Sequence, residues 1–444
     1  MSRPDRIVLG VGAGLLVLHL AAMELLRKPD GRVVFGDATH HFVQLRSMVF
    51  DRDLHFQNEY TRIYGLRGGE PGTEWVTTEH TVTGHVRNYM PVGPALLWMP
   101  LYLIVAAGQW ALSALGLTGV PDGFDRALQL VPGVTGVLST IAAALLCLRL
   151  ARTRTDETTA LVSVLAVWLG SHAIYYSLVS PSYSHAASML ATSAFFYRWI
   201  TTRDAPSIGR LAGWGALAGL AALMRWQDAL LVGIPLMEAL RWRASVVARL
   251  GGGLAAIAAA ALVFAPQMAI WTVLYGQPLA IPQGASFMRW TSPHPVAVLL
   301  SDNHGLFTWA PILIPATLGL LTIVRRERAL ALPLVAVVVA AWYTNAAVAD
   351  WWAGEAFGAR RFLSLFPLFV LGTARWLGGR EASAGRSWRH GALVVLTGLN
   401  LLLLLQYQLF MKGLVLLSPY PQFWADMFLT RFVVPFRLLQ WMWS

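Results

Sequence analysis

The arrangement of the whole chain depends on residues 91–116, PVGPALLWMPLYLIVAAGQWALSALG. It has the length of a membrane-spanning helix, which needs about 20 largely apolar residues. However, it begins with several prolines and carries Gln109 and Trp110 in its second half. Such a run either crosses the bilayer or lies in its outer interface, and the two choices give every later segment of the chain opposite orientations.

The composition of the 444-residue chain is too apolar for a soluble enzyme. Its hydrophobic fraction is 56% and only 13% of its residues are charged, whereas soluble domains carry about 25% charge. This excludes a cytosolic globular protein and a disordered chain, and it leaves a polytopic membrane protein. Cys147 is the only cysteine, so an intramolecular disulfide and a thiolate metal cluster are excluded, and we expect it in the core.

Twelve runs are apolar enough to be considered as spans. The first is longer than the hydrophobic core of a secretory signal, about 7–15 residues, so we interpret it as an uncleaved span whose N-terminus faces the cytoplasm. The twelve runs are 7–26, 92–116, 127–149, 158–178, 185–200, 208–224, 227–240, 250–273, 305–324, 329–348, 361–378 and 391–411.

The formal charge of +11 is distributed in a way that indicates topology. Arginines gather in every second connection between runs, and the cytoplasmic loops of membrane proteins are enriched in Lys and Arg. All these connections face the cytoplasm only if one run before residue 149 does not cross. We therefore predict that 92–116 lies in or re-enters the outer interface, which leaves eleven spans, and we expect no nucleic acid partner. The 18 residues concerned are Arg3, Arg6, Arg149, Arg152, Arg154, Arg198, Arg203, Arg210, Arg241, Arg243, Arg249, Arg325, Arg326, Arg328, Arg375, Arg380, Arg386 and Arg389.

The same alternation of connections places the polar loops on the side of the membrane opposite the cytoplasm. Because loops on a rigid scaffold commonly carry chemistry, we expect an outward-facing site built from several of them. The whole chain, 1–444, is interpreted as a single all-α transmembrane domain with no soluble C-terminal domain. The predicted outer segments are a long first loop with interfacial helices (27–126), a short turn near 179–184, the tetrad 225–228, two later loops (274–304 and 349–360) and a C-terminal tail (412–444).

Three carboxylates of the first loop are candidate catalytic residues. Gly36 allows a tight turn that would hold Asp37 at the membrane surface, and the alternative is that Asp37 caps the helix that follows. Asp51 and Asp53 have a spacing that suits a divalent cation carrying a phosphate, and the alternative is a solvated turn. The sequence leaves both pairs of alternatives open.

Four arginines on the outer side depart from the sidedness rule. Arg360 and Arg361 are adjacent, and Arg289 lies in a predicted outer loop. Arg225 opens a polar tetrad that ends at Asp228, and one alternative is that these two residues pair with each other. Guanidinium groups bind phosphate well, so we expect the four arginines to meet an anion such as a lipid phosphate.

Together these motifs resemble the GT-C glycosyltransferases, specifically bacterial members similar to protein O-mannosyltransferases and lipid A aminoarabinose transferases. The matching elements include an acidic residue after the first span, a second acidic element and a Pro-led stretch that resembles the family's external helix. One departure is Ala38, where many relatives have a second acidic residue. The motifs are Gly36-Asp37, Asp51-Arg52-Asp53, Tyr89–Pro94, Tyr183-Ser184-His185, His304–Phe307, Trp351-Trp352 and Phe357–Phe362.

The resemblance implies an inverting glycosyltransferase at the outer face of a bacterial cytoplasmic membrane. Its donor would be a polyprenyl-phosphate sugar, and its acceptor a hydroxyl of a glycan, a lipid or a protein. Asp37 is the expected general base, and Arg225, Arg289, Arg360 and Arg361 are expected to bind the donor phosphate. No cofactor is required, and a divalent cation at Asp51 and Asp53 stays open. Further candidate substrate-binding residues are His40, Glu59, His185, His304, Trp351, Trp352 and Glu355.

Two other classes of protein are alternatives. A transporter or lipid-linked sugar flippase would place ionisable residues near the bilayer midplane, often in repeated halves. Here they cluster at the outer ends of the runs, and no internal repeat is visible. A non-catalytic scaffold would not need outward arginines opposite an acidic loop. Both observations favour an enzyme, although Trp351 and Trp352 also fit an aromatic belt at the membrane interface.

Overall fold

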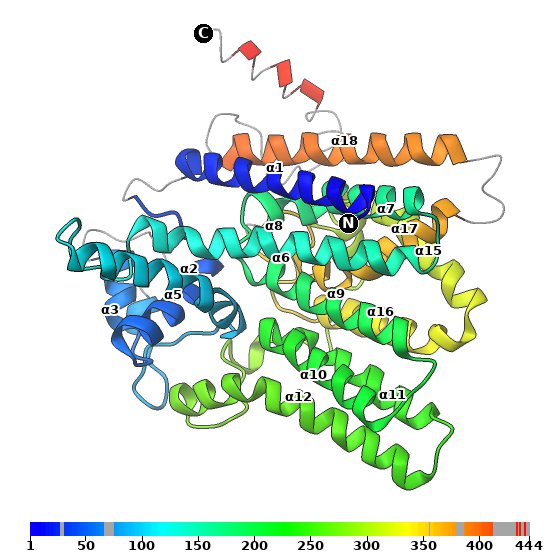
Figure 1. Cartoon of the computed structure of the whole chain (residues 1–444), viewed down its shortest axis with the longest axis horizontal. Helices are drawn as coiled ribbons and strands as arrows, with labels where there is room; N and C mark the ends of the chain where they lie inside the picture. Colours follow the sequence, from blue (N-terminus) through cyan, green and yellow to red (C-terminus); the bar gives the residue numbers. More distant parts are fainter. Residues whose placement is uncertain are drawn as a thin grey trace.

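The chain folds into a bundle of α-helices whose long members run side by side (Figure 1). The computed structural model describes residues 1–26, 31–65, 75–354, 356–378 and 386–411, together with three residue pairs after 431. Within these ranges there is no strand, only two isolated β-bridges. The predicted outer tail, 412–444, therefore lies outside the described residues except for those pairs.

Local sequence signals mark where several helices begin. Pro94 stands in the first turn of α5, where its missing N–H costs no hydrogen bond. Side chains of Asp156, Ser207 and Ser245 accept hydrogen bonds from the first turns of α7, α10 and α12, as good N-cap residues do. The helices are α1 (Arg3–Leu26), α2 (Asp37–Arg46), α3 (Gln57–Tyr60), α4 (Trp75–Thr78), α5 (Gly93–Ala114), α6 (Arg126–Arg152), α7 (Glu157–Gly170), α8 (Tyr175–Leu178), α9 (Ser184–Thr202), α10 (Ile208–Met224), α11 (Gly233–Arg241), α12 (Val246–Tyr275), α13 (Ala297–Leu300), α14 (Leu306–Trp309), α15 (Leu313–Arg326), α16 (Arg328–Ala346), α17 (Phe366–Gly378) and α18 (Arg386–Met411), with short helical turns η1 (Ser47–Asp51), η2 (Thr61–Gly65), η3 (His172–Ile174), η4 (Trp226–Val232), η5 (Ala285–Phe287) and η6 (Arg360–Leu365).

Six helices in the described part of the chain are long and apolar enough to cross a membrane: α1, α5, α6, α12, α16 and α18. A seventh span results if α7 and the helical segment 172–178 form one broken span, bent by 72°. The length and apolar composition of these helices are those of a membrane protein. The expected total of eleven spans remains a prediction, because α10, α11, α15 and α17 are shorter than a full span.

Helices α1 and α6 pack antiparallel. Asp5 near the start of α1 forms an ion pair with Arg152 at the end of α6, at 2.9 Å. Farther along, a Cβ on Gly12 would overlap Ile141, and a Cβ on Gly133 would overlap His19. The end of α1 and the start of α6 therefore lie at the same end of the bundle. This is the geometry expected if run 92–116 does not cross the membrane. Helices α2, α3 and α5 lie at that end (Figure 1).

The arginine-rich connections meet at the opposite end of the bundle. Arg203, after α9, forms an ion pair with Glu238 of α11 at 2.9 Å. Arg203 and Arg241 both donate to the carbonyl oxygen of Ala329, at the start of α16. Connections far apart in sequence are therefore brought together, as expected if they share one side of a membrane.

Small residues let helices α10 and α12 approach closely. A Cβ on Gly215 would overlap the carbonyl oxygen of Ala256, and a Cβ on Gly219 would overlap that of Ala260. Small residues spaced four apart are a common contact between helices in membranes, because backbone atoms can then touch. This contact holds α10 in place, and Arg225 follows directly at its C-terminal end.

Candidate functional site

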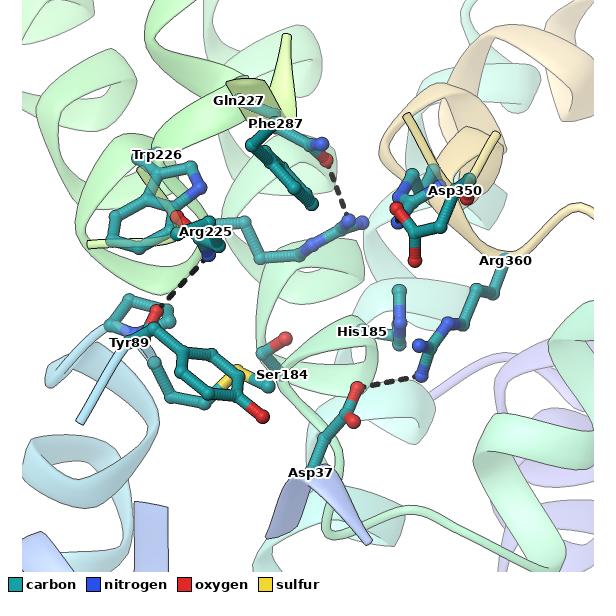
Figure 2. A pocket seen from close by; sticks show the side chains of 14 residues that line it. Asp37, Tyr89, Ser184, His185, Arg225, Trp226, Gln227, Phe287, Asp350 and Arg360 are labelled. Carbon is teal, nitrogen blue, oxygen red and sulfur yellow. Dashed lines mark hydrogen bonds and ion pairs between the residues drawn. The ribbon is translucent and has the colours of Figure 1, made fainter. Parts of the chain in front are cut away.

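A cavity of about 220 Å³ opens at the end of the bundle opposite the arginine-rich connections. Six segments far apart in sequence line it: the start of α2, residues 89–91, the start of α9, the turn between α10 and η4, residues 283–287, and residues 350–361. Figure 2 shows charged side chains from these segments pointing toward one another across the cavity. Three arginines and two aspartates are among the lining residues.

Asp37 and Arg360 form an ion pair inside this cavity. Nη1 of Arg360 donates to Oδ2 of Asp37 at 2.6 Å. Burial acts to raise the pKa of Asp37, but the charge and the hydrogen bond of Arg360, together with smaller effects of His40 and His41, hold that pKa below its ordinary value. Burial acts to lower the pKa of Arg360, and Asp37 raises it. Both groups are therefore charged near neutral pH while they are paired.

The backbone before Asp37 explains how its carboxylate reaches the cavity. Gly36 has a φ of 57°, a conformation that favours glycine, and a Cβ there would overlap the hydroxyl of Tyr183. Asp37 then occupies the first turn of α2, and Gly36 caps that helix without a side-chain bond. The Tyr183 ring also lies 5.7 Å from the guanidinium of Arg360. Gly36 and Tyr183 thus set the position of the ion pair.

Arg361 has a different carboxylate partner. Its Nη2 donates to Oδ1 of Asp350 at 2.8 Å, and its Nη1 donates to the carbonyl oxygen of Asp350 at 2.7 Å. Adjacent arginines thus point to separate partners, Asp37 and Asp350, on two sides of the cavity. Both arginines line the cavity.

Arg225 is the cavity arginine with unused hydrogen-bonding capacity. It is 8% exposed, its Nη2 donates to Oε1 of Gln227 at 2.7 Å, and its Nη1 has no partner among the described residues. Burial lowers the pKa of Arg225 to about 10, against the opposing effect of the charge on Asp228. A buried, unsatisfied guanidinium N–H is costly, and Figure 2 shows this group extending into the cavity. An anion bound there would satisfy it.

The alternative in which Arg225 pairs with Asp228 is not what the structure has. Asp228 instead accepts hydrogen bonds from the hydroxyls of Ser188 and Ser364, each at 2.5 Å. No direct ion pair between Arg225 and Asp228 occurs within the described residues. The guanidinium is therefore left facing the cavity.

Of the other expected residues, His185 lines the cavity and His40 lies behind it. His185 is 3% exposed, and its Nδ1 has no partner in the described part of the chain. His40 is buried beside Asp37 with its Nδ1 2.7 Å from the hydroxyl oxygen of Tyr60, and burial lowers its pKa to about 4. His40 is therefore neutral and supports α2 without reaching the cavity.

Several expected residues are placed elsewhere. Arg289 is exposed and does not line the cavity. Trp351 packs near His294, at 5.9 Å between ring centroids, and Trp352 is 37% exposed. His304 is buried against Trp309, at 4.6 Å between ring centroids. The expected residue Glu355 lies outside the described residues.

The second acidic element forms a separate cluster. Arg46 donates to Asp51 and, at 3.0 Å, to Glu59, while Asp53 accepts from the hydroxyl of Ser47 at 2.7 Å. Burial raises the pKa of Glu59 to about 7, against the opposing hydrogen bond from Arg46. Among the described residues no group of three His, Cys, Asp or Glu side chains has the arrangement of a metal site. These carboxylates are held by Arg46 and Ser47, away from the cavity.

Sequence reasoning did not select some of the lining residues. Tyr89, Ser184, Gln227, Gln283 and Asp350 all line the cavity. Four of them stand in or beside segments already singled out: the Pro-led stretch, the motif before His185, the polar tetrad and the segment before Trp351. Their position in or beside those motifs is the sequence feature that could have identified them. Gln283 stands in no such motif.

Comparison with known proteins gives limited similarity. No protein-family model matches the chain, and no curated protein matches it. Three chains of solved structures match. One is the archaeal oligosaccharyltransferase AglB from Archaeoglobus fulgidus, in complex with an inhibitory peptide and a dolichol-phosphate. It is 12% identical with a TM-score of 0.43, and the match covers 93% of this chain and 60% of that one. The chain thus spans 60% of the length of that protein.

Proposed function

We propose that the protein is a membrane glycosyltransferase that moves a sugar from a polyprenyl-phosphate donor to an acceptor hydroxyl. The observation that carries this proposal is the meeting of a carboxylate and an unsatisfied guanidinium in one cavity, at the end of the bundle opposite the arginine-rich connections. Asp37 and Arg225 both line that cavity, and Nη1 of Arg225 lacks a partner among the described residues. Such a site offers a base and an anion-binding group within reach of one small ligand.

The arginines suit the charge that develops in sugar transfer. When the bond between the sugar C1 and the phosphate oxygen breaks, the phosphate leaves with the electron pair. Preorganised cations in a dry site lower the barrier of such a step, each by a few kcal/mol. Arg225, Arg360 and Arg361 line the cavity. Arg289 is exposed elsewhere, so the proposed phosphate site contains three arginines and not the four expected from sequence.

Asp37 is the proposed general base. The acceptor oxygen forms its bond to C1 as the bond to phosphate breaks, and the hydroxyl proton passes to the carboxylate. This single displacement inverts the configuration at C1. While Asp37 is paired with Arg360, its low pKa makes it a weak base. A donor phosphate that competes for Arg360 would weaken the pair and raise that pKa, so that donor binding prepares the base.

The size of the cavity favours a small donor head group. Its volume of about 220 Å³ is below the ~300–1,000 Å³ of pockets that hold drug-sized ligands. A single sugar on a phosphate suits this space better than an oligosaccharide, and the lipid tail would extend into the bilayer. The exposed apolar side chains of α5, including Leu103 and Ile104, give this end of the bundle a lipid-compatible surface.

The test uses purified protein and a panel of radiolabelled polyprenyl-phosphate sugars with glycan, lipid and peptide acceptors. Wild-type protein is expected to transfer one sugar, and Asp37→Asn to lose transfer while still folding. Asp5→Asn is the matched control, because Asp5 also pairs with an arginine but at the opposite end. Equal transfer by wild type and Asp37→Asn would contradict the base assignment. Movement of intact donor across vesicles without transfer would instead favour a flippase.

A further inference from the structure

A second polar layer lies behind the cavity. Asp228 of η4 is 3% exposed, and its two carboxylate oxygens accept separate hydrogen bonds, one from Ser188 of α9 and one from Ser364 of η6. The two serine hydroxyl oxygens are themselves 3.3 Å apart. The three side chains therefore form a closed triangle that ties three segments of the chain together.

Each member of this triangle stands three or four residues after a cavity-lining residue of the same segment. That spacing is about one turn of a helix, so the triangle repeats the arrangement of the cavity one layer deeper in the bundle. A shift of one segment relative to another would move a layer residue and a lining residue together. The pairs are Ser184 with Ser188, Arg225 with Asp228, and Arg360 with Ser364.

The triangle is costly to bury, which argues against simple packing. A buried carboxylate needs hydrogen bonds or an opposite charge to offset its lost hydration. Asp228 has two hydroxyl donors and no direct ion pair in the described chain. Beside it lies a cavity of about 20 Å³, also lined by Gln227 and Arg361, which is enough for one water molecule. The layer is thus polar and continuous with the groups that line the main cavity.

We propose that Asp228 is a positioning residue, which holds Arg225 and Arg360 at the spacing needed to contact one phosphate. It acts through its hydrogen bonds to Ser188 and Ser364 and does not touch the ligand. This inference rests on the proposed function, because it concerns the same phosphate site. To the residues that bind the phosphate, it adds one that aligns the arginines.

A hydrogen-bonding role and a purely electrostatic role predict opposite results. If Asp228 acted only through its charge, its removal would leave the cavity more positive and tighten the binding of an anion. Asp228→Ala and Asp228→Asn would then behave alike. If it acts by its hydrogen bonds, Asp228→Ala loses both, whereas the amide of Asp228→Asn can accept from one serine and donate to the other.

The experiment measures binding of farnesyl phosphate, a short isoprenyl phosphate, to full-length protein in detergent by calorimetry. Farnesol, which lacks the phosphate, is the control ligand. We expect Asp228→Ala to lose about tenfold in affinity, the scale of hydrogen bonds to a charged group, and Asp228→Asn to stay within about threefold of wild type. Farnesol binding is expected to be the same in all three proteins.

Glu238→Ala is the matched control for stability. Glu238 is 7% exposed and accepts hydrogen bonds from Trp199 and Arg203 at the arginine-rich end. We expect it to lower the melting temperature as Asp228→Ala does, with farnesyl phosphate affinity unchanged. If Asp228→Ala does not fold, Ser364→Ala removes one hydrogen bond on the η6 side, and about a threefold loss of affinity is expected.

The possible outcomes separate the two proposals. If wild type binds farnesyl phosphate and every variant at Asp228 or Ser364 binds it equally or more tightly, the positioning role is overturned and the proposed function stands. If Asp228→Ala and Asp228→Asn lose affinity equally, the hydrogen-bond argument is overturned. If wild type binds farnesyl phosphate no better than farnesol, the phosphate site itself is overturned, and the role of Asp228 with it.

Discussion

The carboxylate of Asp37 lies 2.6 Å from Nη1 of Arg360, although the two residues are 323 positions apart in the chain. The pair joins the first helix after α1 to the turn before α17. It closes one side of the cavity. Through it, the candidate base and a candidate phosphate-binding group are bonded to each other. A phosphate that competes for Arg360 would loosen its hold on Asp37.

Replacing Arg360 tests this shared use. We expect Arg360→Ala to reduce sugar transfer by about 10²–10³-fold, the range seen when one group that stabilises transition-state charge is removed. The variant should also lose thermal stability, because the Asp37 carboxylate is left without its partner. In a double-mutant cycle with Asp37→Asn, the two stability losses should not add. Additive losses, or transfer within a few-fold of wild type, would contradict a functional pair.

Arg225 and Arg289 give a matched comparison of two outer arginines. Arg225 is buried in the cavity with a free Nη1 within the described structure, whereas Arg289 is exposed outside it. We expect Arg225→Gln to weaken farnesyl phosphate binding by at least tenfold and Arg289→Gln to leave it unchanged. Calorimetry on both variants and on wild type measures this. Equal losses at both positions would place the phosphate outside this cavity.

The contrast between these two arginines also shows what a sequence pattern can predict. Arg225, Arg289, Arg360 and Arg361 all depart from the predicted sidedness, and three of them line one cavity. Three of them converge because α10, η6 and their neighbours pack there, whereas Arg289 lies two residues beyond the lining residue Phe287 and is exposed. The pairings of Asp37 with Arg360 and of Arg361 with Asp350 depend on that packing, which no local pattern specifies.

The acidic candidates show the same limit. Gly36 and Asp37 were identified from a local turn signal, and the positive φ of Gly36 is the feature that this signal reflects. Asp51 and Asp53 have a spacing typical of metal ligands, but Arg46 and Ser47 reach them from the preceding helix turn. Spacing indicates which groups are near one another, whereas their partners are determined by the direction of each side chain.

Glu59 is expected to make stability depend on pH. Its pKa is raised from an ordinary value of 4.5 to about 7 by burial, so the folded state favours the protonated form. The contribution is fully present below pH 4.5 and is lost as the pH rises through about 7. Glu59→Gln should therefore melt at a higher temperature than wild type at pH 8, by a few degrees, with little difference at pH 5.

Glu79→Gln is the control for this titration, because Glu79 forms an exposed pair with Arg87. Its melting temperature should follow that of wild type at both pH values. A Glu59→Gln variant that is less stable than wild type at pH 8 would mean that the ion pair with Arg46 outweighs the cost of burial.

The contact between α10 and α12 can be tested with two glycines of the same helix. A Cβ at Gly215 would overlap the Ala256 carbonyl, whereas one at Gly213 meets nothing within 4 Å. We expect Gly215→Leu to separate the helices and lower the melting temperature by several degrees, and Gly213→Leu to be close to neutral. Because Arg225 follows α10, Gly215→Leu should also weaken farnesyl phosphate binding. Equal stability of the two variants would contradict the close contact.

The position of α5 decides the topology of everything that follows it. Asp122 lies in the connection between α5 and α6, near Arg62 of the first outer loop, with 2.6 Å between Oδ2 and Nη1. The antiparallel packing of α1 and α6 requires this connection to lie on the side where α1 ends. A reporter enzyme inserted at Asp122 is therefore expected to be active outside the cytoplasm, and one inserted after Arg154 inside it. Activity of the Asp122 fusion in the cytoplasm would mean either that the whole bundle is inverted or that α5 crosses the membrane, against the packing of α1 on α6. In both cases the arginine-rich connections would face outward, against the positive-inside rule.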